Sequence, residues 1–181
     1  MISLLGRSIV LIGLMVAVMG TAVAFVSARR QNRRGMILAR QSAYVFAVCM
    51  ILATALMEYA LLTNDFSVSY VAQVGSLATP TVITIVSLWS ALEGSILLWA
   101  LFLGVFTLIF AYQSRKLDLQ QSAYSLGVLL AICVFFAFLV ASLANPFAPM
   151  EQVPKDGPGP NPLLQNHPLM IIHPPSLYAG F

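Results

Sequence analysis

The side chains able to do chemistry in this 181-residue sequence are few enough to be considered singly. They are Glu58, Asp65, Glu93, His167 and His173. The sequence has no GxSxG element, no phosphate-binding glycine loop, no CxxC pair and no run at metal-ligand spacing. It therefore gives no indication of a catalytic triad or a multi-residue metal site, and any chemistry must rest on single residues.

His173 has the most informative surroundings. Pro174 and Pro175 follow it, and a proline disfavours the helical conformation in the residue before it. We therefore expect an extended, stiff segment that presents the imidazole with little entropy to lose on binding. Its apolar neighbours at 170–172 would suit a role for His173 as an axial ligand to a haem iron. The alternative is that His173 only makes hydrogen bonds within a loop. His167, in a polar neighbourhood, is expected to be solvated.

Glu93 interrupts a long apolar stretch, where an ionised carboxylate is costly. Two interpretations remain open. Glu93 caps the start of a membrane helix together with Gly94 and Ser95, or it binds a ligand directly. Glu58 has the same two interpretations, and the structural one is favoured for it.

The composition indicates the class of protein that positions these residues. Apolar residues make up 60% of the chain, charged residues 8%, and the mean hydropathy is +0.90. Soluble domains carry about 25% charged residues, so a soluble enzyme and a disordered chain are both excluded. We predict an all-α, polytopic membrane helical bundle. Cys49 and Cys133 each lie within an apolar run and are expected to be small packing residues.

The apolar runs divide the chain into a transmembrane domain and a proline-rich tail. Residues 1–144 are predicted to hold four spans, at about 8–28, 42–62, 95–112 and 122–143, with a loop from 63 to 76 and an interfacial helix at about 80–92. Most of the chain's ten prolines lie in residues 145–181, so this region is predicted to be an extended external segment.

The basic residues predict the orientation of the spans. Five arginines follow the first apolar run and only Arg7 precedes it, a pattern typical of an uncleaved helix and not of a signal peptide. The two proposed inner loops hold seven Lys and Arg residues, and all outer segments hold two. We therefore predict four crossings with both termini outside, and we interpret the net charge of +3 as an orientation signal with no nucleic-acid partner.

Four blocks of the sequence resemble one known family. Residues 161–181 (NPLLQNHPLMIIHPPSLYAGF) are similar to the "NPLLQ…HPPxLYxGY" signature of the cytochrome c-type biogenesis haem lyase subunits of the CcmF/NrfE type. Residues 66–72 (FSVSYVA), 89–99 (WSALEGSILLW) and 145–147 (NPF) resemble further elements of that family, in the same order. The chain departs from the family at 90–92, where Ser-Ala-Leu replaces a polar run. It also ends before the tryptophan-rich "WWD" segment and the membrane histidines of the family, so it resembles the N-terminal portion alone.

The resemblance implies a function in cytochrome c maturation. Haem is the implied cofactor. The implied partners are a haem chaperone, a CxxCH apocytochrome c with its thiol-handling subunit, the remainder of the lyase chain, and membrane lipid. The implied location is the bacterial inner membrane, with the functional face on the periplasmic side, and the fragment alone is expected to be inactive. The residues implied to bind haem are His173 as axial ligand, Pro174, Pro175, Tyr178, Trp89 and Glu93.

Two other classes of function remain as alternatives. A transporter or channel subunit should have broken helices or charges near mid-membrane, whereas the spans here are free of charge except near their ends. A non-catalytic assembly scaffold is not distinguished from a lyase component by the sequence.

Overall fold

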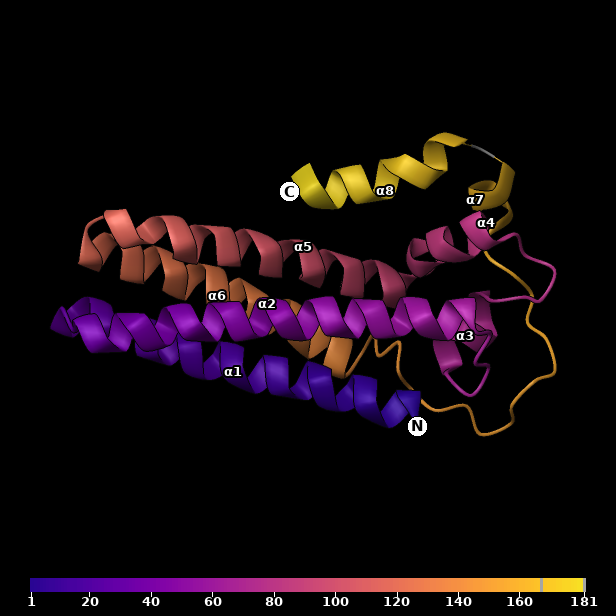
Figure 1. Cartoon of the computed structure of the whole chain (residues 1–181), viewed down its shortest axis with the longest axis horizontal. Coiled ribbons are helices and arrows are strands. Elements are labelled where there is room, and N and C mark those ends of the chain that lie inside the picture. The colour runs from indigo at the N-terminus through magenta and orange to yellow at the C-terminus, as the bar shows by residue number, and fades with distance from the viewer. Residues whose placement is uncertain (167, 181) are drawn as a thin grey trace.

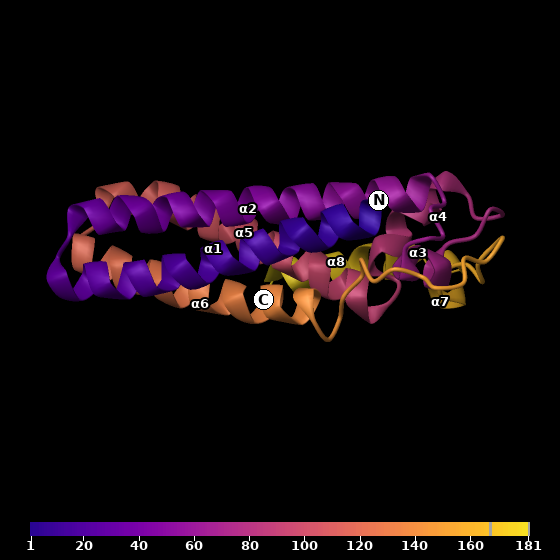
Figure 2. The ribbon, with the colours of Figure 1, turned by 90° about the horizontal axis from the view of Figure 1, so that it is seen from below.

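The chain forms a bundle of four long helices, which lie side by side in Figure 1 and in the perpendicular view of Figure 2. The computed structural model describes residues 1–166 and 168–180, and within them four helices are long and apolar enough to cross a membrane. They are α1 (Ile2–Arg30), α2 (Arg33–Leu62), α5 (Leu92–Gln113) and α6 (Leu119–Ala141). The predicted all-α membrane bundle is confirmed. α1 and α2 begin at Ile2 and Arg33, earlier than the predicted spans.

Small residues bring the helices of the bundle close together. The buried residues of α1 recur every three or four positions and include Gly6, Gly13, Ala17 and Gly20. A Cβ atom at Gly20 would lie 2.6 Å from Ser42 Cβ on α2, so only glycine allows this approach. Small residues are enriched at such interfaces because lipid provides no hydrophobic force between helices, which must then associate by close packing.

One end of the bundle is closed by two tight, polar connections. Between α1 and α2, the Asn32 side chain accepts hydrogen bonds from the backbone N–H groups of Arg34 and Gly35, at 3.1 and 3.4 Å. Between α5 and α6, the 3₁₀ turn η2 (Ser114–Lys116) leads to Asp118, whose carboxylate caps α6. We call this the arginine end, after the basic residues Arg29, Arg30, Arg33, Arg34, Arg40 and Arg115.

The opposite end carries three short helical elements between α2 and α5. They are α3 (Ser69–Val74), α4 (Thr81–Val86) and the 3₁₀ turn η1 (Ser87–Trp89). The expected loop at 63–76 thus contains a helix, and the expected interfacial helix at 80–92 ends as a 3₁₀ turn at Trp89. An isolated antiparallel bridge between Val68 and Pro149 ties this region to the segment that follows α6.

The prediction of an extended segment up to the C-terminus is wrong for the described residues beyond 161. Residues 142–161 do run without a regular element, but α7 (Pro162–Asn166) and α8 (Pro168–Gly180) follow. In Figure 1, α8 lies alongside the part of α5 nearest α4, and His173 belongs to this helix.

Packing explains why α8 stays helical despite Pro174 and Pro175 inside it. Each proline removes a backbone donor and disfavours the helical conformation before it. The Ser176 hydroxyl donates to the Ile172 carbonyl at 2.8 Å, which supplies an extra hydrogen bond next to the prolines. α8 also packs against α5, and an apolar environment favours a helix because its remaining backbone groups are paired internally.

Candidate functional site

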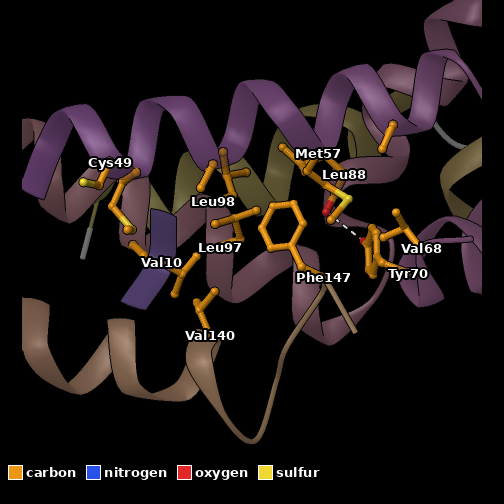
Figure 3. Close-up of a cluster of buried hydrophobic side chains, with 14 of the residues drawn as sticks. Val10, Cys49, Met57, Val68, Tyr70, Leu88, Leu97, Leu98, Val140 and Phe147 are labelled. Carbon is orange, nitrogen blue, oxygen red and sulfur yellow. Dashed lines mark hydrogen bonds between the residues drawn. The ribbon is translucent and has the colours of Figure 1, made fainter. Parts of the chain in front are cut away.

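Tyr70 organises the end of the bundle opposite the arginine end. Its side chain is only 1% exposed, and its hydroxyl lies 2.8 and 2.9 Å from the carbonyl oxygens of Leu88 and Ser87, between which it shares its one hydrogen. The hydroxyl also accepts from the Ala91 N–H at 3.4 Å. Figure 3 shows the bond to Leu88 within the buried apolar cluster that contains Phe147. Tyr70 therefore fixes the turn between η1 and α5 against α3.

The electrostatic surroundings of Tyr70 include two carboxyl groups. Burial raises the pKa of Tyr70 well above its ordinary value, and the nearby charges of Glu93 and Glu58 act in the same direction. The phenol is consequently neutral at physiological pH and available as a hydrogen-bond donor.

The Glu-Gly-Ser element at 93–95 forms the first turn of α5. A Cβ atom at Gly94 would overlap the Leu88 carbonyl oxygen and the Tyr70 hydroxyl, so glycine is required for this close approach. The Ser95 hydroxyl donates to the Trp89 carbonyl at 3.2 Å. Gly94 and Ser95 therefore have structural roles, because they hold the η1–α5 turn in place.

Glu93 lies at the start of α5, as the capping interpretation expects, but it makes no capping hydrogen bond there. α5 begins at Leu92 with Ala91 at the N-cap position, and no side chain makes a capping bond there. Glu93 lies inside the first turn, where its negative charge still interacts favourably with the helix dipole. The physical reason is that α5 starts one residue before Glu93. Glu93 is therefore not at the N-cap position, from which a side chain accepts hydrogen bonds from the N–H groups of the first turn.

Four buried polar atoms in this region make no hydrogen bond within the described part of the chain. They are Glu58 Oε2, Trp89 Nε1, Ser90 Oγ and Glu93 Oε2. Buried polar atoms are nearly always paired in folded proteins. We call Glu58, Tyr70, Trp89 and Glu93 the polar cluster; it offers carboxylate oxygens and an indole N–H to a partner.

His173 lies in a different setting, on α8. Its side chain is exposed and lines an open cavity of about 570 Å³. The rest of the lining is largely apolar and comes from α7 and α8, namely Leu163, Leu169, Met170, Ile172 and Ser176. An exposed imidazole beside apolar side chains is the arrangement that a haem ligand requires.

Tyr178 and the two prolines hold α8 in place. The Tyr178 ring stacks on Trp99 of α5, with the centroids 5.4 Å apart and the planes at 25°, and Trp99 in turn packs on Phe136 of α6 at 4.6 Å. At 100° per residue, Tyr178 and His173 lie roughly 140° apart around the helix. Pro174 and Pro175 are half-buried. The face that carries Tyr178 is therefore docked, and His173 stays accessible.

The structure separates the predicted site residues into two groups. Trp89 and Glu93 belong to the polar cluster, whereas His173, Pro174, Pro175 and Tyr178 share α8. Within the described residues, neither Trp89 nor Glu93 lines the His173 cavity, and no three His, Cys, Asp or Glu side chains gather as a metal site. His167 lies outside the described residues.

The sequence alone did not indicate the structural roles of two residues, Tyr70 and Asp156. Tyr70 lies within the FSVSYVA block but received no role, because a buried hydroxyl that bonds to carbonyl groups 17 and 18 residues away has no local signal. Asp156 was also missed. Its carboxylate accepts from the Leu77 N–H at 2.9 Å and so anchors the 142–161 segment to the α3–α4 loop.

Known proteins resemble the chain over its whole length. Residues 89–181, which include all six predicted site residues, match the family model described as cytochrome C assembly protein. The cytochrome c-type biogenesis protein CcmF of Pseudomonas aeruginosa is 37% identical over 182 residues, covering 100% of this chain and 28% of that protein. CcmF of Escherichia coli is 30% identical over 178 residues, covering 98% of this chain and 27% of that protein.

A solved structure named cytochrome c haem lyase CcmF has a TM-score of 0.85 and 32% sequence identity, covering 98% of this chain and 28% of that one. The chain thus spans little more than a quarter of the length of these relatives. With its four membrane-length helices, it is a multi-pass protein of the bacterial inner membrane. It belongs to the cytochrome c assembly protein family and matches the haem lyase subunits of the CcmF/NrfE type.

Proposed function

We propose that this chain is the N-terminal part of a cytochrome c haem lyase and that it positions haem at the outer membrane face for attachment to CxxCH apocytochromes c. Haem is the substrate, and the two cysteine thiols of the apocytochrome add across its vinyl groups to form thioethers. The residues of this chain contribute binding and orientation, which are the protein's part in such chemistry.

The observation that carries the proposal is the His173 cavity on α8. A porphyrin needs an apolar wall and a ligand to its iron, and Leu169, Met170 and Ile172 stand beside the exposed imidazole. The residues that line the His173 cavity therefore fit a haem group. Tyr178, stacked on Trp99, holds the helix that presents His173, so the ligand loses little freedom when it binds.

The placement of the cavity supports an outer functional face. α8 lies alongside the half of α5 farther from the arginine end (Figure 1), and the polar cluster lies where that half of α5 begins. The arginine end carries seven of the nine Lys and Arg residues, and positive residues are retained on the cytoplasmic side. His173 then faces the periplasm, where an apocytochrome and its thiol-handling subunit meet the enzyme.

The partners follow from the same proposal. A haem chaperone delivers haem to the α8 face, and the apocytochrome approaches from the same side with its thiol-handling subunit. The remainder of the lyase chain supplies the second axial ligand and encloses the porphyrin, because one histidine and one open apolar wall leave most of it uncovered. Trp89 and Glu93, at the same end of the bundle, are proposed to contact the bound haem or to support the segments that do.

Maturation of a reporter cytochrome c in cells with the otherwise complete lyase tests the assignment. We expect His173→Ala and His173→Gln to abolish covalent haem attachment at normal levels of membrane-inserted protein, since neither side chain ligates iron as imidazole does. His167→Ala is the control and should keep most of the activity. Normal maturation in His173→Ala would overturn the proposal.

A further inference from the structure

Two arginines at the arginine end are held in place by the junction of α2 with α5. Arg40 Nε donates to Ser114 Oγ at 3.2 Å, and Arg40 Nη2 donates to the Ser114 carbonyl oxygen at 2.9 Å. Arg115 Nη2 donates to the Tyr44 hydroxyl at 3.1 Å, and its guanidinium carbon lies 5.1 Å from the centroid of the Tyr112 ring. The two side chains are thus oriented by the fold.

These arginines have no acidic partner within residues 1–166 and 168–180. Each hydrogen bond above uses one of the five N–H donors of a guanidinium, so most donors remain for a ligand. The two groups are close enough to act on each other as like charges. Asp118, the acidic residue at this end, directs its carboxylate to the Gln121 N–H at 3.0 Å. Asp118 lines the larger of the cavities around these arginines, but so does Arg33. Three arginines and one carboxylate leave that cavity with a net positive charge, which favours an anion.

Two adjoining cavities open around the pair. One has a volume of about 570 Å³ and the other about 350 Å³, and both are lined by Ile37, Arg40 and Arg115. Ile37 and Leu117, on the rim, are 53% and 54% exposed. The cavities lie where α2 and α5, two membrane-length helices, reach their ends, which is the level of lipid headgroups. At the level of the lipid headgroups, the site therefore has two arginine side chains next to exposed apolar side chains.

We propose that the Arg40–Arg115 site binds the phosphate of an anionic phospholipid from the leaflet at the arginine end, with an acyl chain against Ile37. Guanidinium groups form paired, charge-assisted hydrogen bonds to phosphate, and basic pockets between membrane helices recognise such headgroups. The proposal rests on the bundle alone and is independent of the haem assignment.

Lipid titration of the purified full-length protein, followed by native mass spectrometry, tests the proposal. We expect phosphatidylglycerol to bind at least about tenfold more tightly than phosphatidylcholine. The double variant Arg40→Gln/Arg115→Gln should weaken phosphatidylglycerol binding at least about tenfold, because both guanidinium groups lose their charge-assisted hydrogen bonds to the phosphate, which are roughly twice as strong as neutral ones. Arg115→Gln alone, at an exposed position that leaves the Ser114 bonds intact, should weaken it about fivefold, because one guanidinium still binds the phosphate.

The matched control is Arg29→Gln/Arg30→Gln, which removes the same charge from the same end but outside both cavities. This variant should bind phosphatidylglycerol as the unmodified protein does. An equal loss in the control would show diffuse attraction and overturn the proposal. Competition by millimolar inorganic phosphate would also overturn it, because the site would then recognise a free anion and not a lipid.

Discussion

At the scale of single residues, the η1–α5 turn depends on one buried phenol. Tyr70 reaches two carbonyl oxygens and one N–H of the turn, and Gly94 leaves the space that its hydroxyl occupies. This interlock accounts for the glycine of the Glu-Gly-Ser element without any contact to a ligand. Glu93 is the member of the element that packing does not explain.

Removal of the Tyr70 hydroxyl should lower stability. In Tyr70→Phe, the Leu88 carbonyl stays buried and loses its donor, while the Ser87 carbonyl keeps the Ser90 N–H. Such a loss costs about 1 to 3 kcal/mol. We expect a lower midpoint of thermal unfolding in detergent. Tyr59→Phe is the control, because Tyr59 is 58% exposed, and its midpoint should not change. Equal midpoints for both variants would contradict the role given to Tyr70.

The variant Glu93→Gln tests the charge of the Glu93 side chain separately from its size and shape. The glutamine keeps a hydrogen-bonding oxygen and loses only the charge, whose interaction with the helix dipole is worth about 0.3 to 1 kcal/mol. We expect near-normal protein levels and most of the maturation activity in the complete lyase. A variant that accumulates normally but no longer ligates haem would show that the charge of Glu93 acts on the haem site itself.

At the scale of elements, the outcome for α8 shows where sequence reasoning reaches its limit. The long helices were predictable because lipid-facing spans must be apolar throughout and must pair their own backbone groups. The helical state of His173 was not, because the local effect of Pro174 and Pro175 is opposed by the Trp99–Tyr178 stack, a contact between residues 79 positions apart. His173 itself could be singled out from sequence, since its chemistry and neighbours are local properties.

The anchor between the 142–161 segment and the α3–α4 loop should depend on pH. Hydrogen bonds from the Leu77 and Gly157 N–H groups and from Ser76 lower the pKa of Asp156 below its ordinary value. A lowered pKa means that the anchor is fully present above the ordinary value of about 3.9 and is lost as the pH falls through the folded value.

Hydrogen exchange of the Leu77 amide, corrected for the intrinsic pH dependence, measures this anchor. Protection should hold down to about pH 4 and should fall as the pH drops further through the lowered pKa of Asp156. Asp156→Asn should remove most of this pH response, whereas Glu151→Gln, at an exposed position in the same segment, should leave it unchanged. A response that persists in Asp156→Asn would show that another group holds the loop.

At the scale of the whole molecule, the chain has two chemically different ends. The arginine end gathers seven of the nine basic residues, whereas the other end carries the polar cluster and the His173 cavity. From the positive-inside rule we predict that α8 lies on the outer side of the membrane.

Single introduced cysteines test this orientation. Cys49 and Cys133 are 7% and 0% exposed and serve as an unreactive background. In intact cells permeable only at the outer membrane, Lys155→Cys should react with a membrane-impermeant maleimide and Lys116→Cys should not; both positions are exposed. The reverse labelling would invert the orientation and place His173 on the cytoplasmic side.

The absorption spectrum of haem in the complete lyase tests the central claim, that His173 is an axial ligand, most directly. His173→Gly opens the coordination position, so the account predicts loss of the six-coordinate spectrum and its recovery when imidazole is added. Leu177→Ala, at an exposed position of the same helix outside the cavity lining, should keep the original spectrum. An unchanged spectrum in His173→Gly without imidazole would contradict the assignment.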